Sequence, residues 1–339
     1  MSNHAKIWRI SLTVGLLALL VLLLVLQSYG HSWVRILDTA LLYVLLAIGL
    51  NIVVGYAGLL DLGYAAFFAI GAYTTAFLTS PASPLKFAPG SPWAFLQDFW
   101  VAMVLAVVVA ALFGIVLGAP TLRLRGDYLA IVTLGFGEIV RITFTNLDRW
   151  TGGPNGLLGI AHPQLWVPGH GIVDFGVASA PYYVLLCLVT AAVAGLCVRL
   201  SRSRIGRAWV AIREDEVAAA CTGVPVLRLK LLAQACGGAI AGLAGAIFAA
   251  KQGTITPDSF DFILSVMVLA MVVLGGMGSI RGAIIGALLL GTLPELLRGF
   301  DQYRMLLFGL SMVIIMRLRP QGLFGGTHRR LARDGHAAA

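Results

Sequence analysis

Residues 99–118 read FWVAMVLAVVVAALFGIVLG, and every residue in this run is apolar or glycine. As an α-helix, twenty residues span about 30 Å, the thickness of the hydrocarbon core of a bilayer. Comparable runs occur along the chain at about 8–27, 35–54, 59–79, 127–146, 181–200, 230–250, 261–280, 282–298 and 302–317. Glycine or charge interrupts several of them, which makes one or two candidates for re-entrant segments. The sequence therefore predicts an all-α integral membrane protein, a polytopic helical bundle of about 8–10 transmembrane helices.

The composition of the 339 residues excludes several other classes of protein. Hydrophobic residues make up 59% and charged residues only 12%, about half the charged fraction of a globular domain. A soluble enzyme, a disordered chain and a nucleic-acid-binding domain are excluded, so the net charge of +9 is assigned to loops rather than to a nucleic-acid partner. The four cysteines form no C-x-x-C pair, and neither a disulfide framework nor a metal site is expected.

The basic residues predict an orientation. When ten spans alternate from an N-terminus in the cytoplasm, seventeen of the 24 Lys and Arg residues fall on the cytoplasmic side. This bias follows the positive-inside rule and places both termini in the cytoplasm. Seven of the seventeen lie in one loop at about 199–230. We treat residues 1–324 as one transmembrane domain that contains this loop, and residues 325–339 as a basic cytoplasmic tail.

The loop at about 199–230 carries a helix signal of its own. Acidic residues at 214–216 suit the first turn of a helix, residues 218–220 are all alanine, and Gly223 followed by Pro225 is a stop signal. The pattern predicts a short helix of about two to three turns outside the bilayer. A docking helix for a cytoplasmic partner is the favoured interpretation, and an ordered loop without a partner is the alternative.

At this point the sequence resembles a known family, the permeases of ATP-binding-cassette (ABC) importers. Their coupling-helix consensus is Glu-Ala-Ala, three residues, then Gly, and here Val217-Ala218-Ala219 precedes Gly223 at that spacing, with Val in place of Glu. Further runs at 49–58, 62–73, 122–138, 151–156 and 273–279 are similar to the branched-chain amino acid permeases, and to the LivM-type subunit in particular. The coupling residues that the resemblance implies are Arg213, Glu214, Asp215, Glu216, Ala218, Ala219 and Gly223.

The resemblance implies a division of labour in a bacterial inner-membrane transporter. A second, LivH-type permease, two cytoplasmic ATPase subunits and a periplasmic or lipid-anchored binding protein are the expected partners, with membrane lipid around them and no nucleic acid. The chain has no G-x-x-x-x-G-K-[ST] phosphate loop, so ATP and Mg²⁺ are expected on the ATPase subunits. No catalytic residue, cofactor or metal ligand is assigned to this chain. Urea, short amides and other amino acids remain alternative substrates.

Two glycine clusters interrupt predicted spans near one membrane edge. Glycine allows helices to pack closely, or allows a helix to break where it lines a cavity. In the second case the free N–H and C=O groups would face a zwitterionic amino acid. Both interpretations stay open for the clusters and the two polar residues beside the first of them, namely Asn51, Gly55, Gly58, Asp61, Gly63, Gly275, Gly276 and Gly278.

Two further elements carry possible functions. Glu138 and Arg141 lie on one helix face within a predicted span, where charge by default indicates function. They either neutralise each other or face the pathway or the second permease. The other element is a turn that is predicted to face outward and is either a docking loop for the binding protein or a plain turn: Gly152, Gly153, Pro154, Asn155 and Gly156.

The main rival class is an ion-coupled secondary transporter. Such a protein would usually need intramembrane carboxylates or histidines for coupling. Here Glu138 is nearly alone in the spans, and all six histidines lie in predicted loops or tails.

Overall fold

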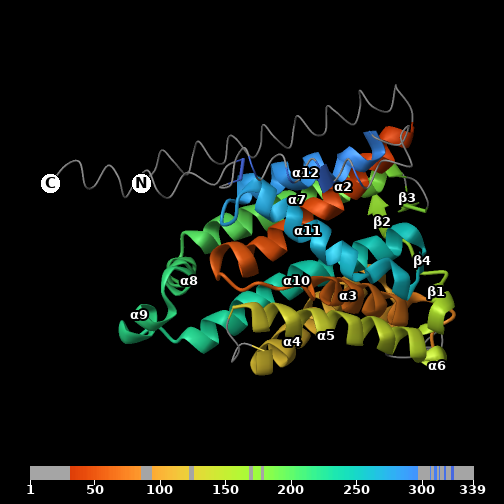
Figure 1. Cartoon of the computed structure of the whole chain (residues 1–339). Helices are drawn as coiled ribbons and strands as arrows, with labels where there is room; N and C mark the ends of the chain where they lie inside the picture. The colour runs from red at the N-terminus through yellow and green to blue at the C-terminus, as the bar shows by residue number, and fades with distance from the viewer. Residues whose placement is uncertain are drawn as a thin grey trace.

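The computed structural model describes residues 31–84, 94–121, 126–167, 171–176 and 179–296, together with residues 306, 309, 310, 313, 317, 322 and 323. These residues form a bundle of helices (Figure 1). Six of the described helices are long and apolar enough to cross a membrane, and two shorter apolar helices join them. The span expected at 8–27 and the tail at 325–339 lie outside the described residues, and the span expected at 302–317 lies almost wholly outside them.

The long helices of the bundle are α2 (His31–Leu50), α3 (Tyr64–Thr79), α4 (Phe99–Thr121), α5 (Asp127–Asn146), α7 (Ser179–Ser201), α10 (Val226–Gln252), α11 (Phe262–Gly275) and α12 (Ile280–Leu296). The short helical elements are η1 (Asn51–Tyr56), η2 (Ala94–Gln97), α6 (Asp148–Thr151), η3 (Gly153–Asn155), α8 (Arg204–Glu214), α9 (Glu216–Cys221) and η4 (Pro257–Phe260). The strands are β1 (Leu157–Leu158), β2 (Gln164–Val167), β3 (Gly171–Asp174) and β4 (Thr254–Ile255).

Helix α10 is the centre of the bundle and packs against α2, α3 and α4. Its contacts depend on residues without bulky side chains. A Cβ atom added to Gly71 of α3 would lie 2.3 Å from the carbonyl oxygen of Gly242, and one added to Gly245 would lie 2.2 Å from the carbonyl oxygen of Phe68. Glycine at these crossings lets the backbones touch, which is the usual way that membrane helices associate.

Helix α4 packs in the bundle through a face of small residues and has an exposed face of large apolar residues. After Phe99 at its start, the buried face carries the small residues Ala102, Ala106, Ala110, Gly114 and Gly118. The exposed face carries Val104, Val108, Leu112 and Val116. Large apolar side chains that face outward suit a helix surrounded by lipid or by another membrane subunit.

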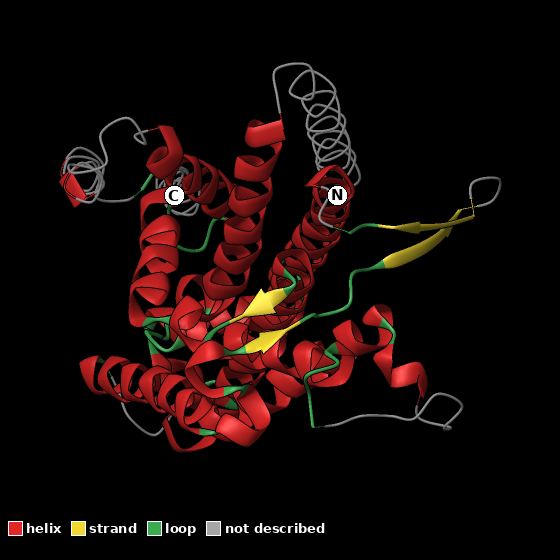
Figure 2. Ribbon diagram, turned by 90° about the vertical axis from the view of Figure 1, so that its right-hand side faces the viewer, coloured by secondary structure: helices red, strands yellow, loops and turns green. Residues whose placement is uncertain are grey.

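The bundle has two distinct ends. Helices α8 and α9 lie at one end, and α6, β1 and β4 lie at the other (Figure 1). Strands β1 and β4 pair antiparallel, with Leu157 opposite Ile255. Strands β2 and β3 form a separate antiparallel hairpin that projects from the helices (Figure 2). The Trp100 indole donates a hydrogen bond of 2.9 Å to the carbonyl oxygen of Gln164 at the start of this hairpin.

Two sequence expectations need correction. Helix α3 begins at Tyr64 and not near residue 59, because the chain between η1 and α3 is not helical and Gly58 has a φ of +71°. The loop at 199–230 holds two short helices, α8 and α9, instead of one. Glu214 is the last residue of α8 and Asp215 lies between the helices, so residues 214–216 do not share one N-terminal turn.

Candidate functional site

The first helix break begins where α2 changes into the π-helix η1 and continues in the non-helical segment before α3. π-Helical turns are rare and frequently occur at functional sites. All six residues of η1 are buried. The side chain of Asn51 is fully buried, and its Nδ2 has no hydrogen-bond partner among the described residues.

The second helix break lies between α11 and α12. Helix α11 ends at Gly275, and the two glycines that follow have positive φ angles, +112° at Gly276 and +81° at Gly278. Glycine adopts this region at no steric cost, whereas other residues pay for it. The chain can therefore reverse within a few residues and enter α12 at Ile280.

The two breaks contact each other, although 227 positions separate the residues that meet. The backbone N–H of Gly278 donates a 2.9 Å hydrogen bond to Asn51 Oδ1. A Cβ atom on Gly55 would lie 2.5 Å from the Gly278 nitrogen and 2.1 Å from Asn51 Oδ1. Gly55 therefore permits the contact, because any side chain there would push the breaks apart.

Arg213, near the end of α8, joins both breaks. Its Nη1 donates a hydrogen bond to the carbonyl oxygen of Gly55. A Cβ atom on Gly58 would lie 2.9 Å from Arg213 Cγ, and one on Gly278 would lie 2.9 Å from Arg213 Nη1. We call this set the glycine junction, formed by Asn51, Gly55, Gly58, Gly278 and Arg213. The sequence singled out each of its residues, and the structure brings them together.

Helices α8 and α9 are fastened to the start of α10. The Trp209 side chain of α8 is buried, and its indole N–H donates a 2.7 Å hydrogen bond to the carbonyl oxygen of Leu229. Lys230 forms a 2.8 Å ion pair with Glu216 of α9. Asp215 caps α9, because its Oδ1 accepts hydrogen bonds from the backbone N–H groups of residues 217 and 218.

The outer surface of α9 is open to solvent. Val217 is 60% exposed, and Ala218 is also exposed, whereas Ala219 faces inward and is buried. Gly223, with a φ of +84°, follows the end of this helix. The two helices therefore present one face to the bundle and one face to whatever lies beyond it.

Asp61 and Gly63 fasten the non-helical segment to its neighbours. Asp61 is 2% exposed. Its Oδ1 accepts a 2.9 Å hydrogen bond from the Gly63 N–H, and its Oδ2 accepts one of 2.6 Å from Gln234 of α10. A Cβ atom on Gly63 would lie 2.0 Å from the carbonyl oxygen of Thr133, so α5 packs directly on the backbone here.

Gly275 has a comparable packing contact within the hairpin of α11 and α12. A Cβ atom there would lie 2.1 Å from the carbonyl oxygen of Gly282, the third residue of α12. Gly275 and Gly63 thus both hold elements close together. The residues of the glycine junction differ from them, because they bring a charged side chain from α8 against the breaks.

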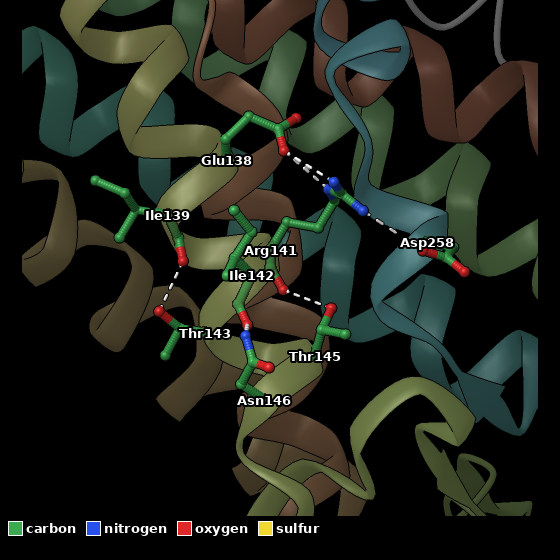
Figure 3. A network of polar contacts seen from close by, with 8 residues as sticks. All are labelled: Glu138, Ile139, Arg141, Ile142, Thr143, Thr145, Asn146 and Asp258. Atoms are coloured by element: carbon green, nitrogen blue, oxygen red, sulfur yellow. Dashed lines mark hydrogen bonds and ion pairs between the residues drawn. The ribbon is translucent and has the colours of Figure 1, made fainter.

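Glu138 and Arg141 pair with each other on α5 (Figure 3). Glu138 Oε2 lies 3.0 Å from both Nε and Nη2 of Arg141, and Arg141 Nη1 lies 3.6 Å from Asp258 Oδ1. The Glu138 and Arg141 side chains are each 32% exposed, and that of Asp258 is 83% exposed. The ion pair between Arg141 and Asp258 joins α5 to η4. Because the cluster holds two carboxylates and one guanidinium, its formal net charge is negative.

The turn at residues 151–156 is a fixed structure at the end of the bundle opposite α8. Gly152, Gly153 and Gly156 have φ angles of +75°, +59° and +69°. A Cβ atom on Gly156 would lie 1.8 Å from the carbonyl oxygen of Ile255, so the turn packs against the chain around β4. Pro154 and Asn155 lie between these glycines in η3 and are exposed.

Sequence reasoning missed one buried ion pair. Lys251 Nζ lies 3.2 Å from Asp38 Oδ2, and these side chains are only 10% and 0% exposed. Lys251 belongs to the last turn of α10, one residue beyond the span predicted at 230–250. The available signal was Asp38 itself, a charged residue inside the predicted span at 35–54. Within the described part of the chain, no group of three or more His, Cys, Asp or Glu residues is placed to hold a metal ion.

Comparison with known proteins identifies the family of the chain. The family described as branched-chain amino acid transport system, permease component, matches residues 32–316. The branched-chain amino acid permease LivM of Escherichia coli K12 is 44% identical over 329 residues, which cover 91% of this chain and 74% of that protein.

More distant relatives include the second permease type. LivH of E. coli K12 is 26% identical, covering 84% of this chain and 91% of LivH. BraD of Pseudomonas aeruginosa is 27% identical, covering 88% of this chain and 96% of BraD. No solved structure matches the chain. With its several membrane helices and a family match over most of its length, the chain is a multi-pass membrane protein that belongs to the permease components of branched-chain amino acid transport systems.

Proposed function

We propose that this chain imports branched-chain amino acids as the LivM-type permease of an ABC transporter and forms the translocation pathway with a LivH-type permease. As a permease it is a transport subunit and not an enzyme. The substrate names of the relatives in E. coli and P. aeruginosa support this substrate class. The observation that carries the proposal is the glycine junction, in which the Arg213 side chain of α8 binds the Gly55 carbonyl and lies next to Gly278, so that it reaches both helix breaks.

The coupling step is assigned to α8 and α9. An ATPase subunit that presses on the exposed face of α9 moves α8, because Asp215 caps α9 and directly follows α8. Arg213 then moves relative to Gly55 and Gly278, which changes the position of both breaks. The residues assigned to coupling are those predicted from the loop: Arg213, Glu214, Asp215, Glu216, Ala218, Ala219 and Gly223. Of these, Ala218 lies on the exposed face that would meet the ATPase, whereas Ala219 is buried and Arg213 contacts the glycine junction.

The remaining partners follow from this arrangement. ATP and Mg²⁺ bind to two separate ATPase subunits, and a periplasmic or lipid-anchored binding protein delivers substrate. The rigid turn at residues 152–156, at the end opposite α8 and α9, is the proposed contact for that protein. The membrane is the bacterial inner membrane, and α8 and α9 face the cytoplasm together with both termini.

Uptake by the complete transporter tests whether the protein belongs to an ATP-driven or an ion-coupled transporter. The chain is purified with its second permease and ATPases and reconstituted into vesicles, and the binding protein and radiolabelled leucine are added. We expect uptake that requires ATP and that stops when the ATPase subunits are inactivated. Uptake driven by a proton gradient without ATP would overturn the proposal in favour of a secondary transporter.

A surface variant tests the docking site. Val217→Arg places a charge on the exposed face of α9 without entering the bundle, whereas Ala219 is buried and unsuitable for this purpose. We expect the ATPase subunits to co-purify poorly with Val217→Arg. The control is Leu165→Arg, which is at an exposed position of β2 and should leave co-purification unchanged. Equal ATPase recovery with both variants would exclude α9 as the docking surface.

A further inference from the structure

A cavity of about 210 Å³ lies between α2, α3, α10 and the segment from η4 to α11. It is separate from the glycine junction, because its lining residues on α2 lie at 39–46 and those on α10 at 248–252. Helix α10 begins near α8 and α9 and is 27 residues long. At 1.5 Å per residue, the cavity therefore lies roughly 35–40 Å along α10 from the cytoplasmic helices.

The inner wall of the cavity is apolar. It is lined by Leu42 and Leu46 of α2, Phe68 of α3, Phe248 of α10 and Leu264 of α11. Leu42, Leu46 and Phe68 are buried. Aliphatic and aromatic side chains of this kind select an apolar group of small size, since drug-sized ligands need about 300–1,000 Å³.

The outer part of the cavity is polar. Thr39, Gln252 and Ser259 line it and are exposed, and Lys251 lies at the border with the apolar wall. An ammonium group has three N–H donors. Among the described residues, Asp38 is the partner that pairs with Lys251, at 3.2 Å, so donors remain for a group within the cavity.

Lys251 offers N–H donors to a carboxylate, and the charges around it are balanced. Asp38 contributes one negative charge, and Arg35 lies one helical turn before Asp38 on α2. Arg35 is exposed and does not line the cavity, so the cation at its border is Lys251, whose charge Asp38 balances. Oxygen atoms of Thr39 and Ser259 on the polar side can accept hydrogen bonds from a cationic group of the same ligand.

We propose that this cavity binds a free aliphatic amino acid, whose carboxylate pairs with Lys251 and whose side chain contacts Leu42, Leu46 and Phe68. The inference rests on the proposed transport of branched-chain amino acids and locates a binding site for them within this subunit. The ammonium group of the ligand lies on the polar side, near Thr39 and Ser259. A small apolar wall next to the remaining N–H donors of a lysine matches the two halves of such a molecule.

Direct binding tests the site. The complete transporter is placed in nanodiscs without the binding protein, and binding of radiolabelled leucine is measured at equilibrium. We expect saturable binding that valine displaces and that leucinamide, which lacks the carboxylate, displaces at least about tenfold less well. A lipid acyl chain is the competing occupant. Wild-type transporter that takes up leucine with ATP but shows no saturable binding would overturn the proposal and leave the proposed function intact.

Three variants separate the contribution of charge from that of packing. Asp38→Asn combined with Lys251→Met removes both charges together and leaves neither charge unpaired. We expect about tenfold to hundredfold weaker leucine binding, the range for loss of a hydrogen bond to a charged group, and loss of the discrimination against leucinamide. Lys251→Arg keeps the positive charge and should retain that discrimination. Unchanged discrimination in the double variant would show that the pair is only structural.

Leu46→Phe tests the apolar wall. The larger ring fills part of the cavity, so we expect leucine binding to fall by about tenfold or more relative to alanine binding. Leu188→Phe on the exposed face of α7 is the matched control and should leave the leucine-to-alanine ratio unchanged. If Leu46→Phe leaves the ratio within twofold of wild type in a transporter that still imports leucine, the cavity is not the binding site.

Discussion

Gly58→Ala is the sharpest perturbation of the glycine junction. The glycine has a φ of +71°, and an L-residue in this region costs roughly 1–2 kcal/mol. The new Cβ would lie 2.9 Å from Arg213 Cγ and 3.3 Å from Arg213 Cα. The near contact with Cα matters most, because the helix α8 itself must move and a side-chain rotation does not relieve it. Overpacking of this kind typically costs about 1–3 kcal/mol.

The sum, about 2–5 kcal/mol, is below or at the lower end of the stability of a folded domain, about 5–15 kcal/mol. We therefore expect the variant to assemble but to transmit motion from α8 poorly. Gly176→Ala is the matched control, since that glycine has a φ of +48° and no atom within 4 Å of the new Cβ. It carries the backbone cost alone.

The assay is the ratio of leucine imported to ATP hydrolysed in vesicles that contain the complete transporter. We expect this ratio to fall several-fold for Gly58→Ala, while ATP hydrolysis continues, and to stay near wild type for Gly176→Ala. Thermal denaturation of both variants reports the stability difference of about 1–3 kcal/mol. Full coupling in Gly58→Ala, or an equal loss in both variants, would refute the role assigned to the contact between α8 and the first break.

Other substitutions test neighbouring contacts. Arg213→Ala should lower the uptake-to-hydrolysis ratio, whereas Arg213→Lys keeps a donor and should retain part of it. Arg204→Ala, on the exposed first turn of α8, is the control and should have no effect. Identical ratios for all three variants would count against Arg213. Asn51→Leu leaves the Gly278 N–H without its acceptor, so thermal denaturation should show a loss of about 1–3 kcal/mol, and an unchanged melting temperature would contradict that. Trp209→Ala removes a buried ring and should cost about 3–5 kcal/mol, seen as release of the ATPase subunits on gel filtration; retained ATPase would disprove the anchoring role.

Much of the bundle follows from local sequence signals. The span predicted at 127–146 coincides with α5, because Gly126 has a φ of +59° immediately before it and the apolar run ends at Asn146. The start of α3 was harder to predict from the sequence. The segment before it is apolar, but Asp61 and a glutamine on α10 hold it in a non-helical conformation. Hydropathy does not report such a long-range hydrogen bond.

The site was predicted only as separate pieces. Glycines at 55, 58 and 278 stood out by type and position, but nothing local indicated that they meet one another and Arg213. The cap at Asp215, which divides the loop at 199–230 into two helices, is visible in the sequence only when Asp is considered as a cap rather than as a first-turn charge. Lys251 and Asp38 pair through the tertiary structure, across 213 positions of the chain.

Because of its length, α10 can transmit a tilt from one end of the bundle to the other. One end of this helix is tied to α8 through Trp209 and to α9 through Lys230, and the other end carries Lys251. A helix of 27 residues is a rod about 40 Å long. A tilt of about 5° around its midpoint moves each end by roughly 2 Å, similar to the helix shifts of about 1–2 Å that accompany switching between conformational states. Because close backbone packing ties α3 and α4 to α10, a small rotation at the end that carries α8 and α9 would reshape the cavity at the far end without any helix being rebuilt.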